Sequence, residues 1–411
     1  MKKFIKFLGF LILVAVVCVG SIHTNQHIKN IKNNIEIASA LVFTPIDKDG
    51  NIVNINDKEE TKDDNVAKAE SSTSDEETEE TVDELNKIVA YMIGDGTNNN
   101  SNGIKKDNIR DVVIPAEYKG LPVVKIGQYA FAESKIEHLT IPDCLKTIDN
   151  HAFYNAVRFN VLNTRSVESI GESAFEYSAI KDITLGAGLK TIGNSAFAHN
   201  SFIENLFVES NQIEDLTADN KVFYLTGRYG HCKITFGDNV ERVPAYMFMP
   251  ISTMSIDTGF KYDTIDFNNV KEIGNCAFAG CSYLKEYNLD KVEKIGKSAF
   301  ALNFVGENIV LKGAKTIEVG SFRFWENLKT VFISKDVLKI LGSDTASQGV
   351  FAPSPYDTDT AVVFYTDAET LPDGWASSNF TCKDSDGVEK FNIVYNTSYE
   401  QYLKLISTDV E

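Results

Sequence analysis

The chain has 411 residues, of which 43% are hydrophobic, and a formal net charge of −18 at pH 7. This is enough apolar material for a large core, and the acidic balance without a basic patch argues against a nucleic acid partner. The six cysteines are widely scattered, which excludes the disulfide framework of small secreted domains.

The chain begins with a segment typical of protein export. Residues 1–6 are rich in lysine, and residues 7–22 are apolar except for Ser21. A charged start followed by an apolar run of this length predicts an export signal over 1–22. The run is longer than a usual signal core but shorter than the ~20 residues of a membrane-spanning helix. The residues therefore leave open whether this segment is cleaved or retained as a membrane anchor.

Two segments separate the signal from the main body of the chain. Residues 23–56 hold two short apolar runs on either side of 47–51, which predicts two strands and a turn. Residues 57–84 contain 13 acidic and 3 basic residues with little to bury, so we expect a disordered acidic linker there. The turn resembles the start of a calcium loop, but an EF-hand would need glycine and glutamate where Ile52 and Lys58 stand.

From about residue 110 onward, the phrase Ile-Gly-x-x-Ala-Phe returns at nearly constant spacing. Its phenylalanines recur at one fixed interval in two series, one starting at Phe131 and the other at Phe278. A fixed period in this range predicts a solenoid, in which each unit buries its apolar face against its neighbours. The predicted structural core comprises Phe131, Phe153, Phe175, Phe197, Phe278, Phe300 and Phe322.

Each repeat unit carries a short strand of alternating polarity. In residues 138–142 this alternation directs Leu139 and Ile141 inward and Thr140 outward. In the phrase itself, we expect the glycine to permit a sharp turn and the phenylalanine to fill the centre of the coil. Cys276 and Cys281 occupy repeat positions, which predicts burial as small apolar side chains.

The regular spacing is interrupted at two places. The interval from Phe197 to Phe248 is more than twice the usual one, which predicts two enlarged units with the middle one near Phe223. The interval from Phe248 to Phe278 is also longer than usual, which predicts an insertion around 252–266.

These phrases, together with Phe278-x-x-Cys281-x-x-Leu284, resemble the BspA-type leucine-rich-repeat family of bacterial surface antigens over roughly 110–366. The resemblance implies a curved, β-rich solenoid of about nine units of roughly 22 residues. It also implies an exported protein, and some members of the family bind host or matrix proteins or other microbes. We expect residues 85–366 to form the solenoid with an N-terminal cap. A last strand should lie at 361–365, and 367–411 should be an irregular C-terminal cap or tail.

The sequence contains no recognisable catalytic signature. No histidine stands beside a serine or cysteine in a hydrolase motif, and the glycines follow the repeat rather than a phosphate-binding loop. The family implies no shared active site either. We therefore predict a protein that is not an enzyme, with no catalytic residues, metal, cofactor or small-molecule substrate.

The leading functional hypothesis is a secreted or cell-surface binding protein that engages a protein or other macromolecule and contacts the membrane only through its N-terminal segment. The alternative is a structural or assembly module of the cell envelope without a host ligand. Both readings place the chain outside the cytoplasm, either free or anchored through residues 7–22.

The strand pattern also predicts a candidate binding surface. The outward residues of successive units include Thr140, Thr184 and Asn288, which are polar, and Val310 and Phe332, which are apolar. Val310 and Phe332 are separated by one repeat interval, so they should lie side by side as a small exposed patch for a partner. The alternative is that these are scattered surface apolar residues of the ordinary kind, or that the strand phase is shifted by one residue there. The patch hypothesis predicts that Phe332→Ser preserves the fold and weakens binding.

Overall fold

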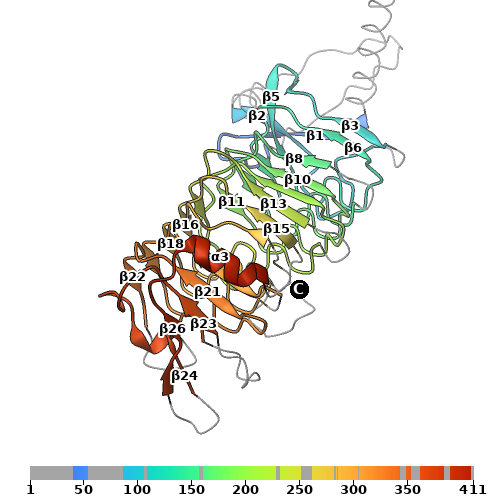
Figure 1. Ribbon diagram of the computed structural model, residues 1–411. Coiled ribbons are helices and arrows are strands. Elements are labelled where there is room, and N and C mark those ends of the chain that lie inside the picture. The colour runs from blue at the N-terminus through green and yellow to red at the C-terminus, as the bar shows by residue number, and fades with distance from the viewer. Residues whose placement is uncertain are drawn as a thin grey trace, which may run out of the picture.

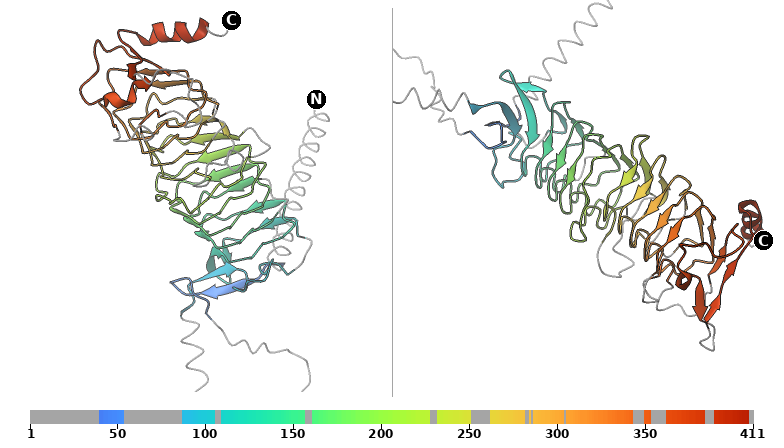
Figure 2. Two further views of the ribbon diagram at one scale, coloured as in Figure 1. Left: turned by 90° about the horizontal axis from the view of Figure 1, so that it is seen from below. Right: turned by 90° about the vertical axis from the view of Figure 1, so that its left-hand side faces the viewer.

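The chain winds into an elongated stack of coils that runs steadily from one end of the molecule to the other (Figure 1). Figure 2 shows the same stack from two further sides, with the N-terminal strands at one end and the C-terminal helix at the other. The predicted export signal (1–22) and acidic linker (57–84) lie outside the described residues. The computed structural model describes residues 40–53, 87–105, 109–156, 161–227, 232–250, 262–281, 284, 286–303, 305–342, 349–352, 362–383 and 389–408.

Each coil contributes a first strand whose side chains alternate between the core and the surface. In β10 (Asp182–Leu185), Ile183 and Leu185 are buried while Asp182 and Thr184 are partly exposed, as the alternating sequence requires. The first strands pair in parallel from coil to coil in three sheets. These sheets are β3 (Asp111–Val113) with β6 (His138–Thr140); β8 (Val161–Asn163), β10, β12 (Asn205–Val208), β13 (Cys232–Phe236), β15 (Tyr262–Asp266) and β17 (Glu286–Tyr287); and β19 (Asn308–Leu311), β21 (Thr330–Ile333), β23 (Val363–Tyr365) and β26 (Ile393–Val394).

A second strand, of only two residues in all coils but the first, follows in most coils and again pairs in parallel with its equivalents. Its isoleucine or valine, such as Ile170 or Val243, is buried in the core. The second strands are β5 (Leu121–Ile126), β7 (Thr147–Ile148), β9 (Ser169–Ile170), β11 (Thr191–Ile192), β14 (Arg242–Val243), β16 (Glu272–Ile273), β18 (Lys294–Ile295), β20 (Thr316–Ile317) and β22 (Lys339–Ile340).

The N-terminal end of the stack is closed by strands from outside the repeats. β1 (Phe43–Ile46) pairs antiparallel with β2 (Ala90–Ile93), which pairs in parallel with β5. β2 lies in the segment for which the sequence predicts an N-terminal cap. β4 (Glu117–Tyr118) adds a short hairpin to β5. Together these strands cover an edge that would otherwise present unpaired backbone groups.

The predicted phenylalanine core forms one stack of rings through the centre of the solenoid. All seven predicted side chains are at most 2% exposed. Neighbouring rings are stacked with centroids 5.0–5.7 Å apart, and the stack extends from Phe131 to Phe351. Phe223 lies between Phe197 and Phe248, at 5.4 and 5.3 Å, which confirms the predicted middle unit of the first interruption.

The glycine of the repeat phrase has a different role from the predicted one. At Gly171 and Gly193 the backbone does not adopt the left-handed conformation; an added Cβ would instead lie 2.4–2.5 Å from backbone atoms of the preceding coil. The left-handed positions come two residues before and two residues after the phenylalanine, as at Ser173 (φ 50°) and Tyr177 (φ 60°). Glycine is therefore needed because adjacent coils approach closely, rather than to make the turn.

The C-terminal segment continues the sheet instead of forming an irregular cap. β26 pairs in parallel with β23, so the strand predicted to be the last is followed by another. β24 (Thr381–Lys383) and β25 (Glu389–Phe391) form an antiparallel pair, and the helix α3 (Tyr399–Thr408) follows. A chain segment without the repeat can join the array because pairing needs a free strand edge and no particular sequence. Within the described ranges, no helix has the length and apolar character to cross a membrane.

Candidate functional site

The outer face of the first strands is largely polar, with one aromatic ring near its middle. Thr184, Phe207 and Thr235 are aligned by parallel pairing on β10, β12 and β13. Phe207 is 42% exposed, whereas its strand neighbours Leu206 and Val208 are buried in the core. Phe207 was not among the binding residues predicted from the sequence, although its outward position follows from the same alternation that placed Thr184.

The predicted pair of Val310 and Phe332 does lie side by side, but it is not an exposed patch. The two residues are aligned on β19 and β21, and Phe332 points away from the phenylalanine core, so the strand phase is as expected. The predicted exposure of Phe332 is wrong, because its side chain is only 1% exposed. It is buried from the outside by α3, which lies beside β21 (Figure 1).

Two tyrosines hold α3 against this part of the sheet. The ring of Phe332 lies 5.3 Å from that of Tyr399 and 5.4 Å from that of Tyr402. Tyr402 is fully buried, and its hydroxyl is 2.8 Å from the Thr330 hydroxyl. Lys312 lies over the Tyr399 ring, with its Nζ 4.1 Å from the centroid. The apolar end of the outer face is thus already occupied by the chain's own helix.

The start of α3 is defined by reciprocal hydrogen bonds. The Ser398 backbone N–H donates to the Gln401 side chain, and the Gln401 backbone N–H is 3.3 Å from the Ser398 hydroxyl. This is a capping box, a common signature of helix starts. Its Ser-x-x-Gln spacing is readable in the sequence, so the helix could have been predicted.

Tyr402→Ala should release α3 from the sheet without unfolding the solenoid. The change removes the buried ring and its hydrogen bond, so the helix should open more often. We expect trypsin to cleave after Lys404 at least about tenfold faster, because each ~1.4 kcal/mol of lost docking energy raises the open population tenfold. The matched control is Leu403→Ala, which alters a 41% exposed side chain of the same helix. Equal cleavage of parent and Tyr402→Ala would contradict the assigned contact.

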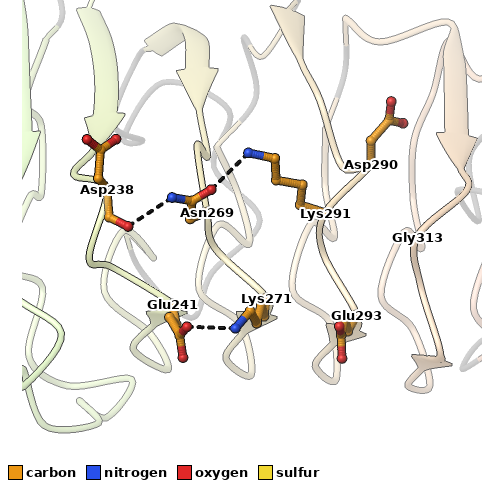
Figure 3. Close-up of a pocket in the computed structure, with 8 residues that line it drawn as sticks. All are labelled: Asp238, Glu241, Asn269, Lys271, Asp290, Lys291, Glu293 and Gly313. Atoms are coloured by element: carbon orange, nitrogen blue, oxygen red, sulfur yellow. Dashed lines mark hydrogen bonds and ion pairs between the residues drawn. The ribbon is translucent and has the colours of Figure 1, made fainter.

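A shallow polar hollow of about 470 Å³ lies between the first and second strands of later coils (Figure 3). Its charged residues pair across neighbouring coils, either with one another or with lysines just outside the hollow. Lys271 Nζ is 2.6 Å from Glu241, and Lys315 Nζ is 2.7 Å from Glu293. The ion pairs raise the pKa of Lys271 and lower that of Glu293. Lys291 donates to Asn269, which in turn donates to the Asp238 carbonyl oxygen. These groups stabilise the stack and leave little unpaired charge for a ligand.

Cys281 and Cys232 are buried in the core of the solenoid. Burial raises the pKa of Cys281 to about 12, and it also raises the pKa of Cys232. Thiols in this state are poor nucleophiles, because only the thiolate attacks. The predicted burial is confirmed for Cys281, whereas Cys276 is only half-buried. Across the described parts of the chain, no three potential metal-ligating side chains come together.

The repeat geometry agrees with the sequence comparison. A family model described as "BspA type Leucine rich repeat region" matches the chain in six copies, over residues 124–255 and 257–347. The chain belongs to the BspA-type leucine-rich-repeat family. The matched residues of this BspA-type chain include the phenylalanine stack from Phe131 to Phe322 and exclude α3.

Several solved structures are similar to this BspA-type chain. A leucine-rich repeat protein from Bacteroides ovatus is 20% identical with a TM-score of 0.30, over 61% of this chain and 84% of that protein. The pneumococcal vaccine antigen PcpA is 17% identical with a TM-score of 0.28, over 68% and 89%. A leucine rich cell surface protein from Faecalibacterium prausnitzii is 16% identical with a TM-score of 0.25, over 76% and 92%. No curated protein sequence matches the chain.

Proposed function

We propose that this protein is an exported, non-enzymatic surface protein that binds a protein partner through the outer face of its first strands. Export is supported by the basic and apolar start of the sequence. The binding role rests on Phe207, a 42% exposed ring in the middle of a parallel sheet. Aromatic anchors surrounded by polar residues are the usual centres of protein interfaces.

The surroundings of Phe207 fit such an interface. Thr184 and Thr235 flank it across the neighbouring strands, and Asn205 and Asp182 are joined by a hydrogen bond of 2.6 Å on the same sheet. These side chains are short and held in place by the strands, so a partner would order few flexible groups on binding. The polar hollow of Figure 3, by contrast, has already paired its charges.

Phe207→Ser should weaken partner binding by at least about tenfold, the usual effect of removing an aromatic anchor. The fold should be preserved, because the ring lies outside the core. Binding would be measured by surface plasmon resonance with the full chain, against a panel of purified matrix proteins and against envelope extract of the producing cell. The matched control is Leu338→Ser, since Leu338 is an exposed apolar residue (68%) outside the first strands.

Binding to matrix proteins and binding to the envelope extract distinguish the leading proposal from its alternative. Phe207-dependent binding to a matrix protein supports a host-directed or matrix-directed function. Phe207-dependent binding to the envelope extract alone would favour the assembly module. Equal binding by parent and Phe207→Ser to every ligand would rule out this surface.

A further inference from the structure

The row of first strands has an open edge at each end of the stack. Its first strand, β3, pairs with β6, and its last strand, β26, pairs with β23. Among the described strands, neither β3 nor β26 has a partner on its other side. The two ends lie at opposite ends of the molecule (Figure 2). Each edge presents backbone groups to which a further strand could pair.

The edge at β3 is protected, whereas the edge at β26 is not. On β3, the exposed Asp111 forms an ion pair with His138 at 2.6 Å, and the inward Val112 is buried. Charged side chains at a sheet edge discourage pairing with another chain. Around β26, by contrast, residues 391–399 include no charged side chain, and Val394 is 43% exposed. The edge at β26 therefore lacks the usual protection.

The core of the stack is also incompletely covered at β26. Strand pairing aligns Ile393 with Phe364, and Phe364 with Val331. Phe364 and Val331 are at most 5% exposed, whereas Ile393 packs against the core but stays partly exposed. Covering this side chain with one more strand would remove apolar surface from water.

The backbone groups of β26 alternate between β23 and the open edge. The Thr366 N–H donates to the Val394 carbonyl at 3.0 Å, so the carbonyl of Val394 points toward β23. Successive residues of a strand direct their N–H and C=O groups to opposite sides. The groups of Ile393 and Tyr395 are therefore directed to the open edge.

The C-terminal end is electrically balanced, unlike the chain as a whole. Residues 389–408 carry two acids and two bases, namely Glu389, Glu400, Lys390 and Lys404. The whole chain has a formal net charge of −18. Like-charge repulsion therefore opposes most approaches of two copies but not an approach at this end. A strongly charged partner would gain no attraction here, so a second copy of the chain is the partner that fits best.

We propose that two copies of this chain join end to end by pairing their β26 strands antiparallel across a two-fold axis. A strand that pairs with its own copy across such an axis is antiparallel to it, and the same groups are satisfied in both copies. An axis perpendicular to the sheet keeps the inner faces of both copies on one side, so each Ile393 gains cover. The contact closes on itself and gives a dimer rather than a filament. It is separate from the surface around Phe207, which the dimer presents twice.

The open edge also determines the register of the pairing. If the groups of both Ile393 and Tyr395 are used, Ile393 of each copy faces Tyr395 of the other. The two Val394 residues then lie opposite each other as a non-hydrogen-bonded pair, with about 4.5 Å between their Cα atoms. A disulfide can bridge Cα separations of about 4.4–6.8 Å. Val394→Cys therefore reports directly on this register.

The test measures the mass of the full chain by analytical ultracentrifugation over a series of concentrations. All proteins are kept in the same non-ionic detergent, so that any association through the apolar residues 7–22 is common to them. Val394→Lys places a charge at the open edge, and the matched control is Val113→Lys, at a 37% exposed valine of β3. Val394→Cys and Val113→Cys are oxidised mildly, separately and as a mixture, with the parent as the background for the native cysteines.

We expect the parent to form a dimer and Val394→Lys to raise its dissociation constant at least about tenfold. Val113→Lys and Phe207→Ser should dimerise like the parent, which keeps the result independent of the function proposed above. Val394→Cys should give a disulfide-linked dimer, and Val113→Cys should not. A parent that is monomeric at every concentration, or a dimer that Val394→Lys leaves unchanged, would overturn the proposal. A mixed disulfide between Val113→Cys and Val394→Cys would overturn it as well, because it would show head-to-tail stacking.

Discussion

Phe175→Ala should lower the free energy of unfolding by about 3–5 kcal/mol, the range for removing a buried phenylalanine side chain. The ring is fully buried and stacks on Phe153 and Phe197 at 5.1 and 5.3 Å. Its loss leaves a cavity that the coils above and below cannot close, because their hydrogen bonds fix the spacing between them. Phe300→Ala should have a similar effect, since this ring lies between Phe278 and Phe322.

Thermal and urea unfolding would measure the loss of stability, and hydrogen exchange would show where it acts. Coils in a solenoid interact mainly with their neighbours, so amides next to the mutated coil should exchange before those at a distance. Phe207→Ala serves as the control. Because this ring lies outside the core, its removal should lower the free energy of unfolding far less. Melting curves of Phe175→Ala and Phe300→Ala that match the parent would show that the ring stack is not the core.

Gly193→Ala should destabilise the chain by about 1–3 kcal/mol or more, although it adds only one methyl group. The new Cβ would lie 2.4 Å from the Glu172 backbone nitrogen and 2.4 Å from the Gly171 carbonyl carbon. These are backbone atoms, so the steric overlap with the new Cβ can be relieved only if the whole coil shifts. Such a shift would strain the 2.8 Å hydrogen bond from the Gly193 N–H to the Ile170 carbonyl.

Gly188→Ala provides a matched control for this effect. An added Cβ at Gly188 would have its nearest neighbour at 3.7 Å, an ordinary contact. Gly188 is not left-handed either, so the substitution should be neutral or stabilise the chain by about 0.4–1 kcal/mol through the unfolded state. If Gly193→Ala and Gly188→Ala melted at the same temperature, close packing of the coils would not be the reason that glycine recurs in the repeat phrase.

The repeated part of the fold was predictable because its signal is both periodic and apolar. Equal spacing of Phe131, Phe153 and Phe175 forces equivalent positions in successive coils, and the phenylalanine pattern even located Phe223 within an irregular stretch. The role of the glycine was predicted wrongly, because spacing along one chain does not reveal how closely the next coil approaches. That distance depends on the neighbour's backbone at Gly171 and Glu172.

The candidate surfaces were less predictable than the core. The alternation correctly predicted that Phe332 points outward. Its ring is nevertheless buried by Tyr399 and Tyr402, which lie far along the chain and outside the repeat. Contacts of this kind depend on tertiary packing and have no periodic signal. The partly exposed rings of the turns were hidden for a related reason: they change position within the turn from coil to coil, as Tyr129, Tyr154 and Tyr177 do, so no single repeat position is aromatic throughout.

The hydrogen bonds between coils also determine how the molecule would respond to tension. Strands of adjacent coils pair in parallel, so these bonds point along the long axis of the stack. A pull between the two ends would therefore load the bonds of a terminal coil first and peel the coils away one after another. Each released unit of about 22 residues adds up to ~75 Å of extended chain. A protein built in this way would lengthen in steps under flow or traction while its remaining coils keep their surfaces intact.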